Sequence, residues 1–322
     1  MTVTDPDTAL PSVADVRAAA GRIRGLVHRT PVLRCAAIDR FAGAEVHLKA
    51  EHLQRAGAFK ARGAANAVQS LDAATAARGV AAHSSGNHAA ALALAAAGRG
   101  IPCRIVMPAD APRVKVAATR GYGAEVVFCE PTLAARESTL ADLLARTGAV
   151  EIHPYDDVRV IAGAGTAACE LLDDVDGLDA IVVPVGGGGL LSGTAVAASA
   201  PGTAVAVWAA EPAGADDALR SYAAGHLIPQ RDPRTIADGL LTSLAPRTFR
   251  ALSELAAGVI PVAEDGIVGA MGLLWERAKQ VVEPSGAVPV AALGDGRFAG
   301  QRVGVVLSGG NVDLAVALDL LR

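Results

Sequence analysis

The sequence predicts an α/β fold with mainly parallel sheets. Short runs rich in β-branched residues are separated by segments rich in alanine and leucine at helical spacing, which is typical of βαβ units. Several runs, such as residues 181–183, are apolar at every position, as expected for strands that helices cover on both faces. The chain has 322 residues, 52% of them hydrophobic and 19% charged, so it can bury an ample core.

The first expected element is a helix that begins after Ser12. Ser12 and Asp15 have the spacing of a capping box. The apolar residues expected on one face of this helix are Val13, Val16, Ala20 and Ile23. Strands are then expected at residues 46–48, 104–107, 125–128, 180–185, 205–208 and 303–307. Helices are expected between several of them, at residues 89–97, 133–146 and 190–198.

The chain divides into two expected domains. Residues 78–157 have their own strand and helix rhythm and predict a smaller domain, whereas residues 1–77 and 158–322 predict a larger one. Ligands of such folds bind at the carboxyl ends of the strands, so polar motifs at those ends are the candidates for function.

Composition and charge exclude several classes of protein. The net charge of −4 argues against a nucleic-acid-binding protein, and no apolar run is long enough to span a membrane. Residues 1–5 lack the pattern of a signal peptide. The cysteines are far apart and form no CxxC pair, which fits reduced thiols: Cys35, Cys103, Cys129 and Cys169. We therefore expect a cytoplasmic protein without nucleic-acid or membrane partners.

Lys60 stands in an apolar setting, between Phe59 and a run of small residues. Burial disfavours the charged form of a lysine and lowers its pKa, which makes the amine a nucleophile toward aldehydes. On this segment alone, a surface lysine whose stem lies along the protein remains an open alternative.

Four consecutive glycines, Gly186 to Gly189, follow an apolar strand pattern and open a helix pattern. Their backbone N–H groups and the helix dipole suit a phosphate. The loop lacks both the Walker A lysine and the GxGxxG register. A tight turn without a ligand is the alternative.

Two further motifs follow apolar runs. Ser84, Ser85, Asn87 and His88 precede an alanine-rich helix and suit a carboxylate, although a simple helix cap also explains the serines. Asn87 can also bond a ring hydroxyl. Ser308 follows the last strand pattern, where its hydroxyl could bond a ring nitrogen or merely end the strand in a turn. A reactive lysine, a phosphate loop, an amide and a hydroxyl together match pyridoxal phosphate.

The chain resembles fold-type II pyridoxal-phosphate enzymes of the serine/threonine dehydratase and serine racemase group, whose two domains are similar to the tryptophan synthase β-subunit. The resemblance extends from Thr30 to Asp313 and rests on an ordered set of motifs around Lys49, Lys60, Asn87, Gly163, Gly186, Gly239, Glu283 and Ser308. Position by position, it implies that Lys60 carries the cofactor as a Schiff base. It further implies cofactor contacts from Phe59, Asn87, Gly186, Gly187, Gly188, Gly189, Gly239, Glu283 and Ser308. The implied substrate contacts are Ser84, Ser85, Asn87, His88, Arg136 and Thr242.

The resemblance also implies a divalent-cation site and a homodimer. Glu211, the carbonyl of Ala215, and Asp217 would supply oxygen ligands suited to Mg²⁺ or Ca²⁺. Without the resemblance, the same acidic residues read as a solvated turn.

The expected activity is β-elimination from L-serine or L-threonine, which yields a 2-oxo acid and ammonia. Lys60 would remove the α-proton. Serine racemisation is the first alternative, because Ser85 could return a proton to the other face of the α-carbon. A 3-hydroxyaspartate ammonia-lyase is the second, and it would need an additional cation near the second carboxylate of the substrate. A non-catalytic phosphate- or nucleotide-binding protein is the alternative from another class.

Overall fold

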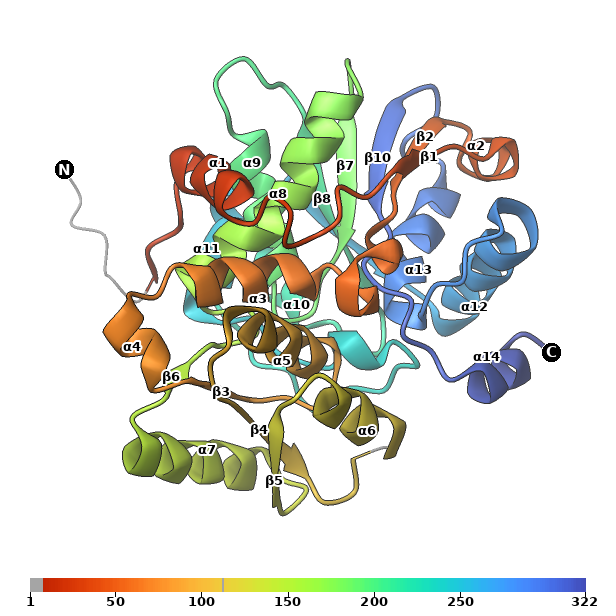
Figure 1. The fold of residues 1–322 in the computed structure, drawn as a ribbon. Helices are drawn as coiled ribbons and strands as arrows, with labels where there is room; N and C mark the ends of the chain where they lie inside the picture. Colours follow the sequence, from red (N-terminus) through yellow and green to blue (C-terminus); the bar gives the residue numbers. More distant parts are fainter. Residues whose placement is uncertain (1–7, 112) are drawn as a thin grey trace.

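The computed structural model describes residues 8–111 and 113–322 and consists of two sheets flanked by helices (Figure 1). This confirms the predicted α/β class. Residues 1–5, on which the expectation about a signal peptide rests, lie outside the described residues. No described helix has the length and hydropathy needed to cross a membrane.

The larger sheet has the strand order β1-β2-β10-β7-β8-β9 and the smaller one β5-β4-β3-β6. All neighbouring strands are parallel except β1 and β2. The strands are β1 (Val32–Leu33), β2 (Glu45–Lys49), β3 (Val80–His83), β4 (Cys103–Pro108), β5 (Glu125–Cys129), β6 (Val150–Glu151), β7 (Ala180–Pro184), β8 (Ala206–Pro212), β9 (Gly258–Val262) and β10 (Arg302–Val306).

The helices surround both sheets. They are α1 (Val13–Arg22), α2 (Ala36–Ala42), α3 (Lys60–Gln69), α4 (Ala73–Ala77), α5 (Asn87–Arg99), α6 (Arg113–Gly121), α7 (Leu133–Thr147), α8 (Val158–Asp174), α9 (Gly189–Ala198), α10 (Asp217–Ala224), α11 (Pro246–Leu255), α12 (Glu264–Leu273), α13 (Pro284–Ala291) and α14 (Leu314–Leu320). A π-helical turn, Leu274–Ala278, follows α12.

All six predicted strands and the predicted helices are present, with bounds shifted by a few residues. Ser12 and Asp15 form the expected capping box, but Ile23 lies just beyond the end of α1. The predictions omit β1 and β6, which have two residues each and show no periodicity. They also omit β3, which is only four residues long, and β9, whose Gly258 and Pro261 are unfavourable in strands.

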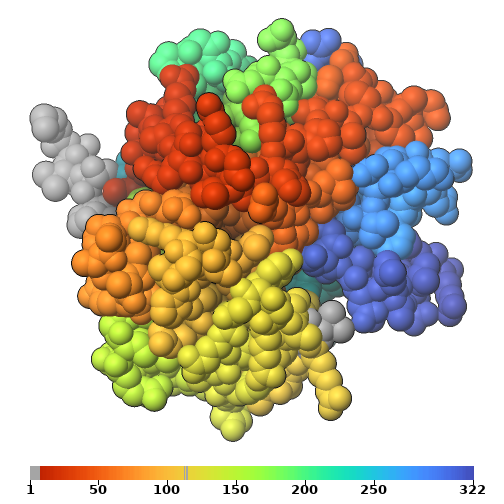
Figure 2. All heavy atoms as spheres, viewed as in Figure 1, coloured from red at the N-terminus to blue at the C-terminus, as the bar shows by residue number. Residues whose placement is uncertain are grey.

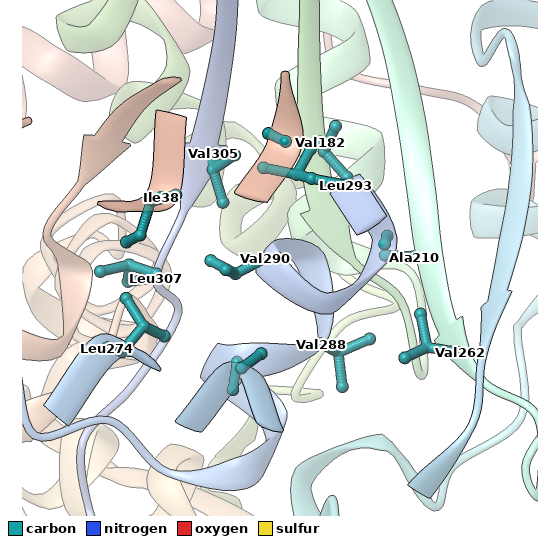
Figure 3. Packing of buried hydrophobic residues seen from close by; sticks show 14 of the residues in the cluster. Ile38, Val182, Ala210, Val262, Leu274, Val288, Val290, Leu293, Val305 and Leu307 are labelled. Carbon is teal, nitrogen blue, oxygen red and sulfur yellow. The ribbon is translucent and has the colours of Figure 1, made fainter. Parts of the chain in front are cut away.

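The larger sheet is covered on both faces, as its apolar strands require. On one face α13 packs centrally, with Val288 and Val290 against Val182 and Val305 of the sheet (Figure 3). On the other face, α9 contributes Leu190 and Leu191 to a second core cluster. Burial on both faces fixes the positions of the loops that follow β7 and β10.

The smaller sheet draws all of its strands from within residues 80–151. These residues gather on the lower side of the molecule in the view of Figure 2, and α3 and α5 contribute to a core with β3 and β4. The boundaries 78–157 remain a prediction.

Candidate active site

Loops from both sheets enclose a cavity of about 640 Å³. They follow the carboxyl ends of β3, β7 and β10. Every residue predicted to contact the cofactor or substrate lines this cavity: Phe59, Lys60, Ser84, Ser85, Asn87, His88, Arg136, Gly186, Gly187, Gly188, Gly189, Gly239, Thr242, Glu283 and Ser308. A surface hollow of about 620 Å³ lined by Asp39, Glu45 and Arg302 contains none of them.

Lys60 is the first residue of α3, and its half-buried side chain lines the cavity. Its Nζ donates a hydrogen bond to the carbonyl oxygen of Pro154 at 2.8 Å and lies 5.0 Å from the centre of the Phe59 ring. Burial lowers the pKa of Lys60 to about 8. The amine is therefore partly unprotonated near neutral pH and able to act as a nucleophile.

The glycine loop, Gly186 to Gly189, lies buried between β7 and α9, and none of its positions has room for a side chain. A Cβ atom on Gly187 would lie 2.3 Å from the ring of Tyr155, and one on Gly188 would lie 2.6 Å from Thr248. Gly188 also has a φ of +86°, which favours glycine.

The glycine loop has unused hydrogen-bond donors. Among the described residues, the N–H groups of Gly186, Gly187 and Gly188 have no protein acceptor. Free backbone donors at the amino end of a helix fit a phosphate group. The loop thus has the features that a phosphate-bearing cofactor requires.

Residues 84–88 lie between β3 and α5. The hydroxyl of Ser84 accepts a hydrogen bond from the amide of Gly86, whereas the hydroxyl of Ser85 has no partner within the described chain. His88 donates from Nε2 to the carbonyl of Ile152 at 2.8 Å, and its buried Nδ1 has no partner there either. Burial lowers the pKa of His88 to about 3, so its imidazole is neutral.

Asn87 is held by residues from the distant carboxyl-terminal part of the chain. Its Nδ2 donates to Glu283 at 2.8 Å and its Oδ1 accepts from Asn311 at 2.9 Å. Burial raises the pKa of Glu283 to about 8, so this carboxyl is mostly protonated at pH 7. The network keeps the Asn87 amide directed along the cavity wall.

Ser308 and Gly239 also line the cavity. Ser308 is 4% exposed, and its hydroxyl has no hydrogen-bond partner among the described residues, so it remains available for a ligand atom. The amide of Gly239 donates to the hydroxyl of Ser285 at 3.0 Å. Ser285 therefore supports the loop that carries Gly239.

Two cations line the cavity from the side of the smaller sheet. Lys115 is paired with Asp238, but Arg136 of α7 has no ion pair or hydrogen bond from its side chain within the described residues. Thr242 lies in the same lining. The cavity thus presents one uncompensated guanidinium group, which suits a second anionic group on a ligand.

Tyr155 and His153 are site residues to which the sequence analysis assigned no role. Their rings stack edge to face with centres 4.6 Å apart, and Tyr155 packs against the glycine loop. Burial lowers the pKa of His153 to about 4 and raises that of Tyr155 to about 12, so both are neutral. Their contacts arise from tertiary packing, so no local spacing in the sequence indicates them.

The predicted cation ligands lie apart from this cavity, at the end of β8 and the start of α10. Glu211 and Asp217 are fully buried, so the interpretation as a solvated turn was wrong. Glu211 accepts hydrogen bonds from the amides of Ala218 and Leu219, and Asp217 accepts one from Leu244. Burial raises the pKa of Glu211 to about 8 and that of Asp217 to about 6.

The described residues hold no group of three or more His, Cys, Asp or Glu side chains that could bind a metal ion, so a cation at these two carboxyls would also need other oxygen ligands, such as the carbonyl of Ala215. Each carboxylate oxygen has two lone pairs, and the backbone amides use only some of them. Two buried acids that form no ion pair with a described lysine or arginine fit a divalent cation.

Comparisons with known proteins agree on the family and differ on the activity. The family model described as "Pyridoxal-phosphate dependent enzyme" matches residues 23–309. A beta-hydroxyaspartate dehydratase of Paracoccus denitrificans is 48% identical over 95% of this chain and 98% of its own length. A serine racemase of Dictyostelium discoideum is 47% identical over 97% of this chain and 98% of its own. The crystal structure of a T.th. threonine deaminase is 45% identical over 94% of this chain and 99% of that one, with a TM-score of 0.90.

Proposed function

The chain belongs to the family of pyridoxal-phosphate-dependent enzymes, and we propose that it catalyses β-elimination from a β-hydroxy-α-amino acid. The product would be a 2-oxo acid and ammonia. The observation that carries this proposal is one cavity that combines the amine of Lys60, the glycine loop and the residue 84–88 loop.

Pyridoxal phosphate, when bound, would supply an electron sink for the negative charge that develops at the α-carbon of the substrate. Lys60 would hold the cofactor and, once released, would take the α-proton, for which its pKa of about 8 is suitable. The free donors of the glycine loop would hold the phosphate, and the hydroxyl of Ser308 would bond the ring nitrogen. Asn87 would bond the ring hydroxyl with its remaining N–H.

The residue 84–88 loop would hold the α-carboxylate of the substrate. It offers backbone N–H groups at the amino end of α5 together with the hydroxyls of Ser84 and Ser85. This arrangement would keep the α-carbon at a fixed place in the cavity, near the amine of Lys60. Loss of the β-hydroxyl, which leaves with a proton as water, would then give an enamine, and hydrolysis of this enamine would yield the 2-oxo acid and ammonia.

We propose 3-hydroxyaspartate as the preferred substrate, ahead of L-serine and L-threonine. The unpaired guanidinium of Arg136 supports this choice, because a substrate with a second carboxylate would compensate its charge. Serine and threonine would leave it unpaired. The beta-hydroxyaspartate dehydratase and the threonine deaminase have similar sequence identity to this chain, 48% and 45%. The choice of substrate therefore rests on the residues that line the cavity.

Ammonia release from L-serine, L-threonine and the diastereomers of 3-hydroxyaspartate tests the substrate. We expect the highest kcat/KM for one 3-hydroxyaspartate diastereomer. Arg136→Met should reduce that value by about ten- to a hundredfold, as expected for loss of a charge-assisted pair of about 1.5–3 kcal/mol, and should leave turnover of L-serine little changed. Equal losses on both substrates would contradict the assignment of Arg136 to the second carboxylate.

Serine racemisation is the second candidate. It is supported by Ser85, whose hydroxyl lines the cavity without a protein partner in the described part of the chain. A chiral assay of L-serine turnover decides between the two reactions. D-Serine formation that is lost in Ser85→Ala would favour racemisation. Formation of a 2-oxo acid without D-serine would exclude racemisation.

We propose three further properties that go with this function. The buried acids Glu211 and Asp217 support a bound Mg²⁺ or Ca²⁺. The four unpaired cysteines support a reducing cytoplasmic location. Exposed hydrophobic side chains on α14 support a homodimer. We also propose the cofactor and substrate contacts that the sequence analysis assigns to the residues lining the cavity.

A further inference from the structure

Residues 153–157 contact both parts of the site that would hold the cofactor. The carbonyl oxygen of Pro154 accepts the hydrogen bond from Lys60 Nζ at 2.8 Å, and the ring of Tyr155 packs on the glycine loop. We propose that the Pro154 carbonyl is the resting acceptor of the free Lys60 amine, and that Asp156 and Arg247 are positioning residues that keep this carbonyl in place. The inference rests on the proposed function only in taking Lys60 as the cofactor-binding amine.

His153 shapes the turn that directs the Pro154 carbonyl. Its Nδ1 accepts a hydrogen bond from the amide of Asp156 at 2.9 Å, so the neutral ring carries its proton on Nε2. The ring of Tyr155 stacks on the same imidazole. The turn is therefore closed by its own side chains and has a defined conformation.

The segment is anchored on both sides. At its amino-terminal side, His88 bonds the carbonyl of Ile152. At the other side, Arg247 of α11 donates from Nε to Asp156 Oδ1 at 2.9 Å and also bonds the carbonyl of Ala9. The Arg247 side chain is 12% exposed and that of Asp156 is 29% exposed, so the ion pair is partly shielded from water. Neither residue lines the cavity.

This anchoring bears on the chemistry of the amine. A free amine that donates to Pro154 has its lone pair directed away from that carbonyl. Burial alone lowers the pKa of Lys60, and no carboxylate contributes to the shift. Lys60 lines the cavity, so loosening of the segment would let more water surround its amine, and the pKa should rise toward the ordinary value of 10.5.

The other titratable and charged groups facing the cavity come from several elements. They are His83 of β3, His88 of α5, Lys115 of α6, Arg136 and Glu137 of α7, His153, Tyr155, Asp238 and Glu283. His153 belongs to the segment and His88 anchors it. Both histidines are neutral above pH 5, because burial lowers their pKa values to about 4 and about 3. Glu283, with a pKa of about 8, titrates in the same range as Lys60, so the labelling must be read at Lys60 itself.

The test measures the pKa of Lys60 in the full-length, cofactor-free protein, from the pH dependence of its labelling by acetic anhydride, read at Lys60 by mass spectrometry. The cofactor-loaded protein serves as a control, because there Lys60 should be protected. We expect a midpoint near pH 8 for the unmodified chain. Asp156→Ala should raise this midpoint by one unit or more, which is a tenfold loss of free amine near pH 7.

Two variants separate anchoring from charge. Asp156→Asn removes the same charge but keeps an acceptor for Arg247, so it should shift the midpoint less than Asp156→Ala does. Arg250→Met breaks the exposed Arg250–Glu254 pair on the same helix and should leave the midpoint unchanged.

An unchanged midpoint in a folded Asp156→Ala protein would overturn the proposal. So would equal shifts in the alanine and asparagine variants, since these would indicate charge rather than position. If Asp156→Ala does not fold, Arg247→Met replaces it in the same assay with the same expected rise. Failure of the proposed function gives a different result, namely a loaded protein in which Lys60 is not protected.

Discussion

Gly187 shows how much of the site depends on the absence of a single side chain. A Cβ at this position would lie 2.3 Å from the Tyr155 ring, which is itself stacked on His153. We therefore expect Gly187→Ala to destabilise the protein by about 1–3 kcal/mol, as overpacking typically does. It should also weaken cofactor binding, because the loop must shift away from the position at which its N–H groups would bond the proposed phosphate.

Gly98 provides the matched control for this substitution. It lies in α5, and a Cβ there would meet no atom within 4 Å. Gly98→Ala should leave cofactor binding unchanged and raise stability by up to about 1 kcal/mol, because alanine is favoured over glycine in a helix. Urea unfolding and titration with pyridoxal phosphate measure both effects, and equal behaviour of the two variants would contradict the steric argument.

At this scale, the sequence predicts residues whose role follows from local context. Lys60, the glycine loop and Ser308 each follow or precede a recognisable apolar pattern. Contacts between residues far apart in the chain could not be predicted from the sequence. Glu283 and Asn87 are 196 positions apart, and Asp156 and Arg247 are 91 apart. No local spacing indicates such pairs, so their partners became visible only once the loops were placed in space.

At the scale of elements, a buried ionic network fixes the helix that carries Lys60. Arg62 of α3 contacts Glu51 at 2.7 Å and Glu170 of α8 at 2.7 Å, and Lys49 of β2 contacts the same Glu170. Arg62, Glu51 and Lys49 have side chains that are 0% exposed. The network joins α3, α8 and β2 two residues from Lys60.

Arg62→Met should therefore destabilise the protein by about 3–5 kcal/mol, because it leaves buried carboxylates without a partner. Arg250→Met is the control, since it breaks an exposed pair with side chains 29% and 51% exposed and should cost less than about 1 kcal/mol. Chemical denaturation of both variants decides. A small effect in Arg62→Met would mean that water or rearranged side chains satisfy Glu51 and Glu170.

The segment between β8 and α10 makes a separate prediction about pH. Burial raises the pKa values of Glu211 and Asp217 to about 8 and about 6, above the values of 4.5 and 3.8 expected in the unfolded chain. A raised pKa of an acid means that the folded state resists ionisation, so stability falls as pH rises from about 4 to about 8. A bound divalent cation would favour the ionised carboxylates and oppose this loss.

We expect Mg²⁺ or Ca²⁺ to raise the melting temperature more at pH 8 than at pH 5, relative to the protein in EDTA. A cation at a hundred times its Kd stabilises a protein by about 2.7 kcal/mol. Glu211→Gln should abolish the response. The stability of this variant without cation will also be lower, because its new amide N–H₂ group would face backbone donors. The quantity to compare is therefore the change in melting temperature on adding the cation. A cation response that is the same at both pH values, or that survives in Glu211→Gln, would exclude these ligands.

At the scale of the whole molecule, the surface of α14 is unusually apolar. Leu314, Val316 and Leu318 are 59%, 57% and 54% exposed, and Val281 is 46% exposed. In Figure 2 the carboxyl-terminal residues, in dark blue, lie at the surface of the molecule. Leu314 and Leu318 are four positions apart and share one face of α14. Exposed hydrophobic side chains on one helix face favour burial against another protein surface, and the proposed partner is a second copy of this chain.

We expect the protein to have about twice its chain mass of 32.3 kDa in solution, as measured by light scattering after size exclusion. Leu318→Glu should shift it toward the monomer, because a homodimer places the new charge in an apolar interface of both copies. Phe128→Glu is the control, since Phe128 is also 46% exposed but belongs to the smaller sheet, away from α14. The shift should depend on protein concentration. A protein that is monomeric at all concentrations, or one whose dimer persists in Leu318→Glu and dissociates in Phe128→Glu, would move the interface away from α14.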